Sequence, residues 1–288
     1  MDSRIIVGIG EVLWDCLPGG RKLGGAPANF AYHVSQFGFE GCVVSAVGED
    51  ELGAEALSQF ADKGLNFEIA EVGFPTGTVE ITLDADGVAA YEFASNVAWD
   101  NIPFTPTFKE LAGKCRAVCF GSLAQRSAVS RATIQRFVRA VPADALKIFD
   151  VNLRQNFYSR ELLDESMELC NVLKINDEEL EVIRELFDLP EGDVKTQCRA
   201  LIWSYGLKML ILTCGERGSH VFTPDEDSFR STPEVEVADT VGAGDSFTAS
   251  FIASILSGKS LAESHSIAAR TAAYVCTHPG AMPPYPKG

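Results

Sequence analysis

The chain has 288 residues, of which 46% are hydrophobic and 22% are charged. These fractions are typical of a globular protein and exclude a disordered or collagen-like chain. The 40 acidic residues outnumber the 24 basic ones, and the formal net charge of -16 repels polyanions, so we expect neither nucleic acid nor an anionic membrane as a partner.

Short apolar runs alternate with helical patterns from the N-terminus onward. The apolar runs cover residues 5–7, 42–47, 117–120, 147–151, 172–175 and 209–212. Uninterrupted runs of this kind are typical of strands buried on both faces of a parallel sheet. Between them, apolar side chains recur at helical spacing, as in Phe30-Val34-Phe37 and Leu180-Ile183-Phe187. The alternation predicts an α/β fold in which helices cover both faces of a mostly parallel sheet.

One stretch after the second strand departs from this alternation. Residues 78–83 alternate between apolar and polar side chains, Asp86-Gly87 supplies a turn, and residues 88–93 have the pattern of a return strand. This arrangement predicts an antiparallel hairpin with one solvent-exposed face. We expect an inserted flap that covers a ligand site, a partner subunit or both.

The sequence carries no sign of a membrane or secreted protein. No apolar run approaches the roughly 20 residues that cross a bilayer, and the first apolar run meets Glu11 too early for a signal peptide. The eight cysteines are scattered without a C-x-x-C pair, and the four histidines are too far apart to predict a histidine metal site. We therefore expect a cytoplasmic protein with reduced thiols.

Two glycine-rich segments fail the tests for common phosphate-binding loops. Gly8-Ile9-Gly10 is followed by Leu13 where the dinucleotide-binding fingerprint needs a glycine, which disfavours an NAD-dependent dehydrogenase. Gly258-Lys259-Ser260 resembles the end of a P-loop, but Ala253 occupies the position of the first glycine. We expect this second segment to be a turn at a helix end.

A third segment, from Asp239 to Asp245, has the character of an anion site. Gly242, Ala243 and Gly244 precede a helical pattern. Glycines let backbone N–H groups converge, and the helix start adds unpaired N–H groups and a positive dipole end. Such a cradle binds an anion without Lys or Arg. Asp245 at its mouth is either the capping residue of an ordinary turn or a base that takes a proton from an attacking hydroxyl.

A further glycine turn, residues 24–29, also opens a helix. It places Asn29 on the first helical turn, and Asp15 follows the first strand closely. Ligand sites in α/β proteins gather at the carboxyl ends of strands. An Asp and an Asn offer acceptors and donors that match vicinal hydroxyls. Each residue taken singly is also compatible with an ordinary turn.

Five motifs together resemble those of the ribokinase-like (PfkB) carbohydrate kinases, and within that family the chain most resembles the fructokinases. The motifs are an N-terminal signature (residues 24–29 with Ala31, Gly38 and Gly48), D-x-N-x-R (150–154), N-x-x-E (176–179), T-x-G (213–215) and a C-terminal signature (239–245). The resemblance covers nearly the whole chain. It implies one ribokinase-like domain over residues 1–288, with the strands of a small lid at about 14–23 and 76–100 inserted in it.

The resemblance also implies an ATP-dependent sugar kinase and a role for each motif residue. The residues implied in catalysis are Asp245 as the base, Gly242, Ala243 and Gly244 as the phosphoryl cradle, and Arg154, with Lys174 as a weaker candidate. Those implied in sugar binding are Asp15, Gly24, Gly25 and Asn29, and those implied in nucleotide binding are Thr213, Gly215, Thr240, His278, Gly280 and Ala281. Asn176 and Glu179 would hold Mg²⁺ through water, and Asp239 with the carbonyl of Val241 would hold a monovalent cation such as K⁺.

The resemblance implies that the phosphoryl acceptor is a ketohexose, and among ketohexoses it favours fructose. The alternatives are 2-keto-3-deoxygluconate, ribose, tagatose or a nucleoside. Fructokinase-like members often carry an Arg after the aromatic strand of the flap, and residues 91–96 contain none, which disfavours a carboxylate-bearing sugar and weakens the assignment to fructose. The intact signature residues disfavour a non-catalytic sugar sensor. The resemblance further implies a homodimer joined through the lid, which fits the apolar face of Val79, Ile81 and Leu83.

Overall fold

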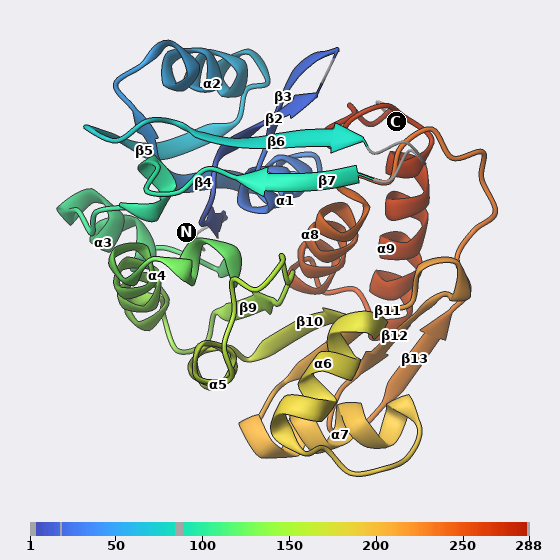
Figure 1. Ribbon diagram of the computed structural model, residues 1–288. Coiled ribbons are helices and arrows are strands. Elements are labelled where there is room, and N and C mark those ends of the chain that lie inside the picture. The colour runs from blue at the N-terminus through green and yellow to red at the C-terminus, as the bar shows by residue number, and fades with distance from the viewer. Residues whose placement is uncertain (1–3, 18, 84–88, 287–288) are drawn as a thin grey trace.

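The computed structural model describes residues 4–17, 19–83 and 89–286, which fold into one large sheet, one small sheet and covering helices (Figure 1). The strands of the large sheet are β1 (Ile5–Ile9), β4 (Glu40–Gly48), β5 (Asn66–Val72), β8 (Ala117–Gly121), β9 (Leu146–Asp150), β10 (Val172–Asn176), β11 (Met209–Thr213), β12 (Ser219–Phe222) and β13 (Asp227–Arg230). Their order is β13-β12-β11-β10-β9-β8-β1-β4-β5.

Neighbouring strands pair in parallel along the sheet order from β5 through β4, β1, β8, β9 and β10 to β11. At the other edge β12 pairs antiparallel with β11, and β13 pairs antiparallel with β12. The mostly parallel sheet is thus confirmed, and all six predicted strands belong to it. The three strands at its two edges, β5, β12 and β13, were not predicted. β5 and β13 are more exposed than the central strands, and β12 is buried but short and begins with Ser219 and His220, so all three lack the continuous apolar run by which a buried strand is found.

Helices cover both faces of the large sheet, as predicted. One face carries α3 (Pro106–Ala112), α4 (Ala128–Ala140), α5 (Arg160–Leu169), α6 (Asp177–Phe187) and α7 (Val194–Tyr205), and the other carries α1 (Ala26–Ser35), α2 (Glu51–Asp62), α8 (Ala243–Leu256) and α9 (Leu261–Cys276). The helical pattern in the sequence extended to Phe37, but α1 ends two residues earlier, at Ser35. The segment Gly258-Lys259-Ser260 joins α8 to α9 as a turn, as predicted, with Ser260 capping α9.

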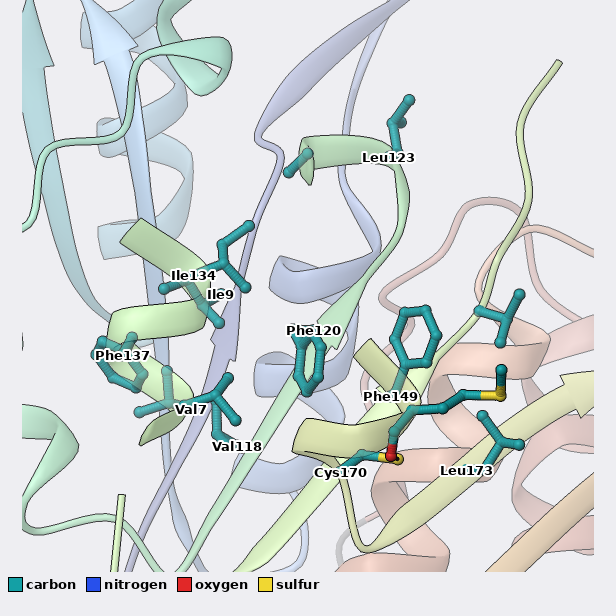
Figure 2. Packing of buried hydrophobic residues seen from close by; sticks show 14 of the residues in the cluster. Val7, Ile9, Val118, Phe120, Leu123, Ile134, Phe137, Phe149, Cys170 and Leu173 are labelled. Carbon is teal, nitrogen blue, oxygen red and sulfur yellow. Dashed lines mark hydrogen bonds between the residues drawn. The ribbon is translucent and has the colours of Figure 1, made fainter. Parts of the chain in front are cut away.

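The central strands are apolar throughout because alternate side chains enter two different cores. On one face Phe120 of β8 and Phe149 of β9 stack with ring centroids 5.2 Å apart, and Phe137 of α4 packs in the same core (Figure 2). On the other face Cys119 belongs to the core that contains Phe251 of α8. A strand with period-two geometry between two helical layers needs an apolar side chain at every position.

The small sheet consists of β2 (Leu13–Leu17), β3 (Gly20–Gly24), β6 (Gly77–Leu83) and β7 (Ala89–Phe93), in the order β3-β2-β6-β7. The predicted hairpin is confirmed, because β6 and β7 pair antiparallel with Val79 opposite Phe93. The predicted turn at Asp86-Gly87 lies outside the described residues. Residues 94–100 leave the sheet and end in the short helix η1 (Ala98–Asp100).

A buried ion pair fixes the root of the small sheet to the large one. Arg126, in η2 (Leu123–Arg126) just after β8, binds both carboxylate oxygens of Asp100 at 2.8 Å and donates to the carbonyl of Ala94 at 2.5 Å. The same guanidinium lies 4.0 Å from the ring of Trp99. Bidentate and charge-assisted contacts of this kind are strong and directional, so the small sheet has a defined position on the body.

The sequence predicts that the apolar face of Val79, Ile81 and Leu83 joins two copies of the chain, but part of this face is buried inside a single copy. Val79 is buried in the chain's own core, while the side chains of Ile81 and Leu83 lie outside the described part of the structure. A homodimer through this sheet stays a prediction. No helix in the described ranges is both long and apolar enough to cross a membrane.

Candidate functional site

The candidate site lies where the order of the parallel strands reverses. The connection from β1 leads to α1 on one face of the sheet, and the connection from β8 leads to α4 on the other. Such a switch point opens a crevice at the carboxyl ends of the strands. A cavity occupies it and is lined by Glu11, Ala26, Pro27, Phe30, Cys119, Phe120, Gly121, Asp150, Asn152 and Asp245.

The predicted glycine turn begins α8 beside this cavity. Gly242 has φ +80, and a Cβ there would stand 2.7 Å from the carbonyl oxygen of Ala281, so both the conformation and the close approach require glycine. The carboxylate of Asp239 accepts hydrogen bonds from the backbone N–H groups of Val241 at 3.1 Å and Gly280 at 3.0 Å. These contacts hold the turn in place next to the start of α8, where the sequence predicts an anion site.

Asp245 lies on the first turn of α8 and faces the cavity. Its Oδ2 accepts a hydrogen bond from the side-chain amide of Asn29 at 2.8 Å. Burial and the nearby carboxylate of Asp150 raise the pKa of Asp245 to about 6, against the lowering effects of Asn29, Lys174 and Arg154. The helix begins at Gly242 without a side-chain cap, so Asp245 is not the capping residue of an ordinary turn. A carboxylate with this pKa is ionised at neutral pH and well suited to accept a proton.

A buried cation lies against the glycine turn. Lys174, in the middle of β10, is 7% exposed and places Nζ 3.1 Å from Oδ1 of Asp150. The same Nζ lies 3.3 Å from the point where a Cβ at Gly244 would stand. Although burial alone would lower it, the pKa of Lys174 is raised because Asp150, Glu179 and Asp245 surround it with negative charge. Lys174, a weaker candidate from the sequence, is therefore a fixed positive charge beside the cradle.

Asn176 and Glu179 form the start of α6. The backbone N–H of Glu179 donates to Asn176 Oδ1 at 2.7 Å, and the backbone N–H of Asn176 donates to Glu179 Oε2 at 2.8 Å. The backbone N–H of Leu153 donates to the other oxygen, Oε1, at 2.9 Å. This capping box fixes both side chains. Burial raises the pKa of Glu179.

The donor chemistry around Glu179 fits Mg²⁺ held through water. In the described ranges no three His, Cys, Asp or Glu side chains cluster as a metal site. Mg²⁺ keeps much of its hydration shell and is usually bound by one or two carboxylates with substrate phosphates, so it needs no such cluster. Each oxygen of Glu179 accepts one backbone N–H and retains a second lone pair for a bound water.

The predicted sugar-side residues meet at the junction of the two sheets. Gly25 has φ +121, and a Cβ there would stand 2.4 Å from the carbonyl oxygen of Glu11. A Cβ at Gly24 would stand 2.6 Å from the carboxylate of Asp15. Burial raises the pKa of Asp15, while Arg154 and Lys22 oppose the rise.

Arg154 is exposed, and its positive charge lowers the pKa of three carboxyl groups of the site. Its charge opposes the rise in the pKa of Glu11, Asp15 and Asp245 alike. Its Nη1 donates to the carbonyl of Leu153 at 3.0 Å, and it follows Asn152, which lines the cavity, by two residues.

The predicted nucleotide-side residues divide into two groups. The first is the segment from Gly280 to Ala281, which contacts Asp239 and Gly242 and therefore borders the cradle. His33 secures it by donating from Nε2 to the carbonyl of Ala281 at 2.8 Å; burial lowers the pKa of His33 to about 4, so the ring is neutral. Thr240 precedes the cradle and is exposed, and its carbonyl accepts from the backbone N–H of Ala243 at 3.3 Å.

The second group consists of Thr213 and Gly215, which lie further along the sheet, and of His278, which follows α9 two residues before Gly280. Thr213 ends β11, where it pairs in register with Asn176. The carbonyl of Gly215 accepts a hydrogen bond from Thr232 at 2.6 Å, and His278 bonds through Nδ1 to the end of its own helix. Within the described residues no hydrogen bond links this group to the glycine turn.

Sequence reasoning missed Glu11 as a functional residue. It follows β1 directly, is 3% exposed and lines the cavity with Asp245. Burial raises the pKa of Glu11 to about 7; Arg154 opposes the rise and Asp245 adds to it. Its position at the carboxyl end of a buried strand was a signal in the sequence that could have identified it.

Comparison with known proteins gives one consistent result. The model of the pfkB family carbohydrate kinases matches residues 16–288. A probable fructokinase-3 from Arabidopsis thaliana is 29% identical to this chain. The match covers 99% of this chain and 89% of the length of that protein. The structure of a fructokinase with bound ATP from Xylella fastidiosa superposes with a TM-score of 0.83, at 21% identity over 97% of this chain and 94% of that chain. The structure of a putative ribokinase II in complex with ATP and Mg²⁺ from E. coli superposes with a TM-score of 0.82. It is 21% identical and covers 97% of this chain and 94% of that chain.

Proposed function

Because the chain belongs to the pfkB family of carbohydrate kinases, and is therefore a phosphotransferase that acts on a sugar hydroxyl, we propose that it transfers the γ-phosphoryl group of ATP to the primary hydroxyl of a ketohexose, fructose. The observation that carries the proposal is the position of Asp245. Its carboxylate lies on the first turn of α8, beside the N–H groups of the glycine turn and in the wall of the cavity. A base and an anion site thus face the same space.

In this proposal Asp245 takes the proton of the sugar hydroxyl as the hydroxyl oxygen attacks phosphorus. The backbone N–H groups of Gly242, Ala243 and Gly244 hold the phosphoryl group while negative charge shifts onto its oxygens. Lys174 adds a buried positive charge at Gly244, where the low dielectric strengthens its effect.

The two residue groups described above would bind the nucleotide, and its phosphates would lie near the cradle. The ATP in the structures from Xylella fastidiosa and E. coli supports ATP as the phosphoryl donor, and the Mg²⁺ in the second supports a magnesium requirement. When bound, Mg²⁺ neutralises charge on the phosphates, and Asn176 and Glu179 would hold it through water. Asp239 and the carbonyl of Val241 remain a predicted site for a monovalent cation such as K⁺.

On the acceptor side, Asp15, Gly24, Gly25 and Asn29 would bind the sugar hydroxyls. Arg154 is exposed and would reach the sugar or the γ-phosphate. We assign the small sheet, whose strands lie within residues 13–24 and 77–93, as a lid on a single domain. A lid over the sugar excludes water, which otherwise competes with it for the phosphoryl group.

The test is an ATP-consumption screen of the purified chain with Mg²⁺ over about twenty sugars and nucleosides, followed by identification of the phosphorylated carbon. Fructose phosphorylated at a primary hydroxyl is the expected result. Preferred turnover of 2-keto-3-deoxygluconate, ribose, tagatose or a nucleoside would replace fructose but keep the kinase assignment. Sugar binding without ADP release would instead identify a sensor.

A further inference from the structure

We propose that Glu11 contacts the acceptor, accepts a hydrogen bond from one of its hydroxyl groups and restricts the site to uncharged sugars. The inference rests on the proposed function and extends it, because it names the chemical class of the substrate and a residue that selects it.

The first observation is an unpaired oxygen. Glu11 Oε2 is buried, and no donor among the described residues reaches it. The backbone N–H groups of Glu11 and Ala26 act on the same carboxyl and lower its pKa, so the group is already held from one side. A buried carboxyl oxygen without a partner is unfavourable, and a ligand hydroxyl in the cavity would satisfy it.

The second observation is a similar oxygen nearby. Asn29 is 4% exposed, and its Oδ1 likewise has no partner among the described residues. Its amide group must face Asp245, because that carboxylate accepts from Nδ2 at 2.8 Å, and so the carbonyl oxygen is the free end. Glu11, Asn29 and Asp245 therefore present a set of acceptors, and acceptors recognise the hydroxyl donors of a polyol.

The third observation is the charge balance. Glu11, Asp15 and Asp245 carry carboxyl groups, and among the described residues the exposed Arg154 is the cation whose charge lowers the pKa of all three. The nearby Lys174 is paired with Asp150. A carboxylate or phosphate on the acceptor would lie among these like charges and be repelled, whereas an uncharged sugar would not.

Glu11→Gln tests the proposal without changing the shape of the side chain. The backbone N–H groups that act on the carboxyl require an acceptor, so they orient the new amide with its oxygen toward them and its NH₂ toward the cavity. The variant therefore replaces an acceptor by a donor and removes one negative charge. Glu168→Gln, at an exposed position on α5, is the matched control.

The measurements are KM and kcat for fructose and for 2-keto-3-deoxygluconate, an anionic sugar, together with the thermal midpoint of each variant. We expect Glu11→Gln to raise KM for fructose about tenfold with little change in kcat. The ratio of kcat/KM for fructose to kcat/KM for the anionic sugar should fall by about the same factor. The midpoint should not fall, because the variant keeps the contacts to the backbone N–H groups and removes a buried negative charge. The control should match the wild type throughout.

Two results would overturn the inference while the proposed function stands. One is an unchanged KM and preference in Glu11→Gln; the other is a lowered midpoint with a fall in kcat for both sugars alike, which identifies a structural role. A wild-type chain that turns over the anionic sugar best also overturns it. If the wild type consumes no ATP with any sugar, the proposed function fails, and the inference fails with it.

Discussion

The side-chain amide of Asn29 donates a hydrogen bond of 2.8 Å to Asp245, a residue 216 positions further along the chain. The bond joins the first turn of α1 to the first turn of α8 at the mouth of the cavity. It fixes the orientation of the proposed base and lowers its pKa against the effect of burial. The two glycine turns of the sequence are thus parts of one site.

Asp245→Asn should abolish sugar-dependent ADP release, with kcat lower by about 10²–10⁴-fold, because the amide cannot take a proton. Sugar affinity, measured by calorimetry without ATP, should change little. Asp144→Asn, at an exposed loop position, is the control. Near-normal turnover in Asp245→Asn would remove this residue from the role of base.

The pH dependence of the reaction should follow Asp245. The base is active when ionised, so kcat/KM should fall as the pH drops through about 6, the raised pKa of this carboxyl. Asn29→Leu removes a hydrogen bond that lowers the pKa, and should move this limb of the profile to higher pH. Asn29→Asp places a second carboxyl beside the first and should move it further. An identical acid limb in all three proteins would contradict the assignment.

Gly242→Ala should be much more harmful than Gly258→Ala, although the two glycines have nearly the same φ, +80 and +81. Both substitutions incur the strain of the left-handed region, about 1 kcal/mol. A Cβ at Gly258 meets nothing within 4 Å, whereas one at Gly242 would stand 2.7 Å from the Ala281 carbonyl oxygen. The measurements are KM for ATP and unfolding by urea, and equal effects of the two variants would show that the close approach at the cradle is unimportant.

Glu179→Gln should raise the Mg²⁺ concentration needed for half-maximal activity. It should also reduce the free energy of unfolding by about 1–3 kcal/mol, because one of the two backbone N–H groups that now donate to the carboxylate loses its acceptor. The neighbouring exposed Glu178→Gln controls for charge. Lower stability with an unchanged Mg²⁺ titration would assign Glu179 to the start of α6 alone.

Much of the architecture could be predicted because its signals are local. A strand buried between two helical layers is apolar at each position, and all six strands of this kind were identified, as was the hairpin of β6 and β7. The glycine turn before α8 was recognisable for the same reason, since a helix start and a left-handed residue each leave a short pattern. The edge strands were not identified because polar residues interrupt their apolar runs, at exposed positions in β5 and β13 and at the start of the short, buried β12.

The sequence by itself determined which segments form strands and helices, the glycine turn at Gly242 and the presence of carboxylates near strand ends, because neighbouring residues set backbone geometry. Only the tertiary structure decided what those carboxylates do. The raised pKa of Asp245 depends on burial and on Asp150, and the burial of Glu11 depends on how α1 and β8 close around it. Desolvation and charge coupling act through space, so no local pattern in the sequence records them.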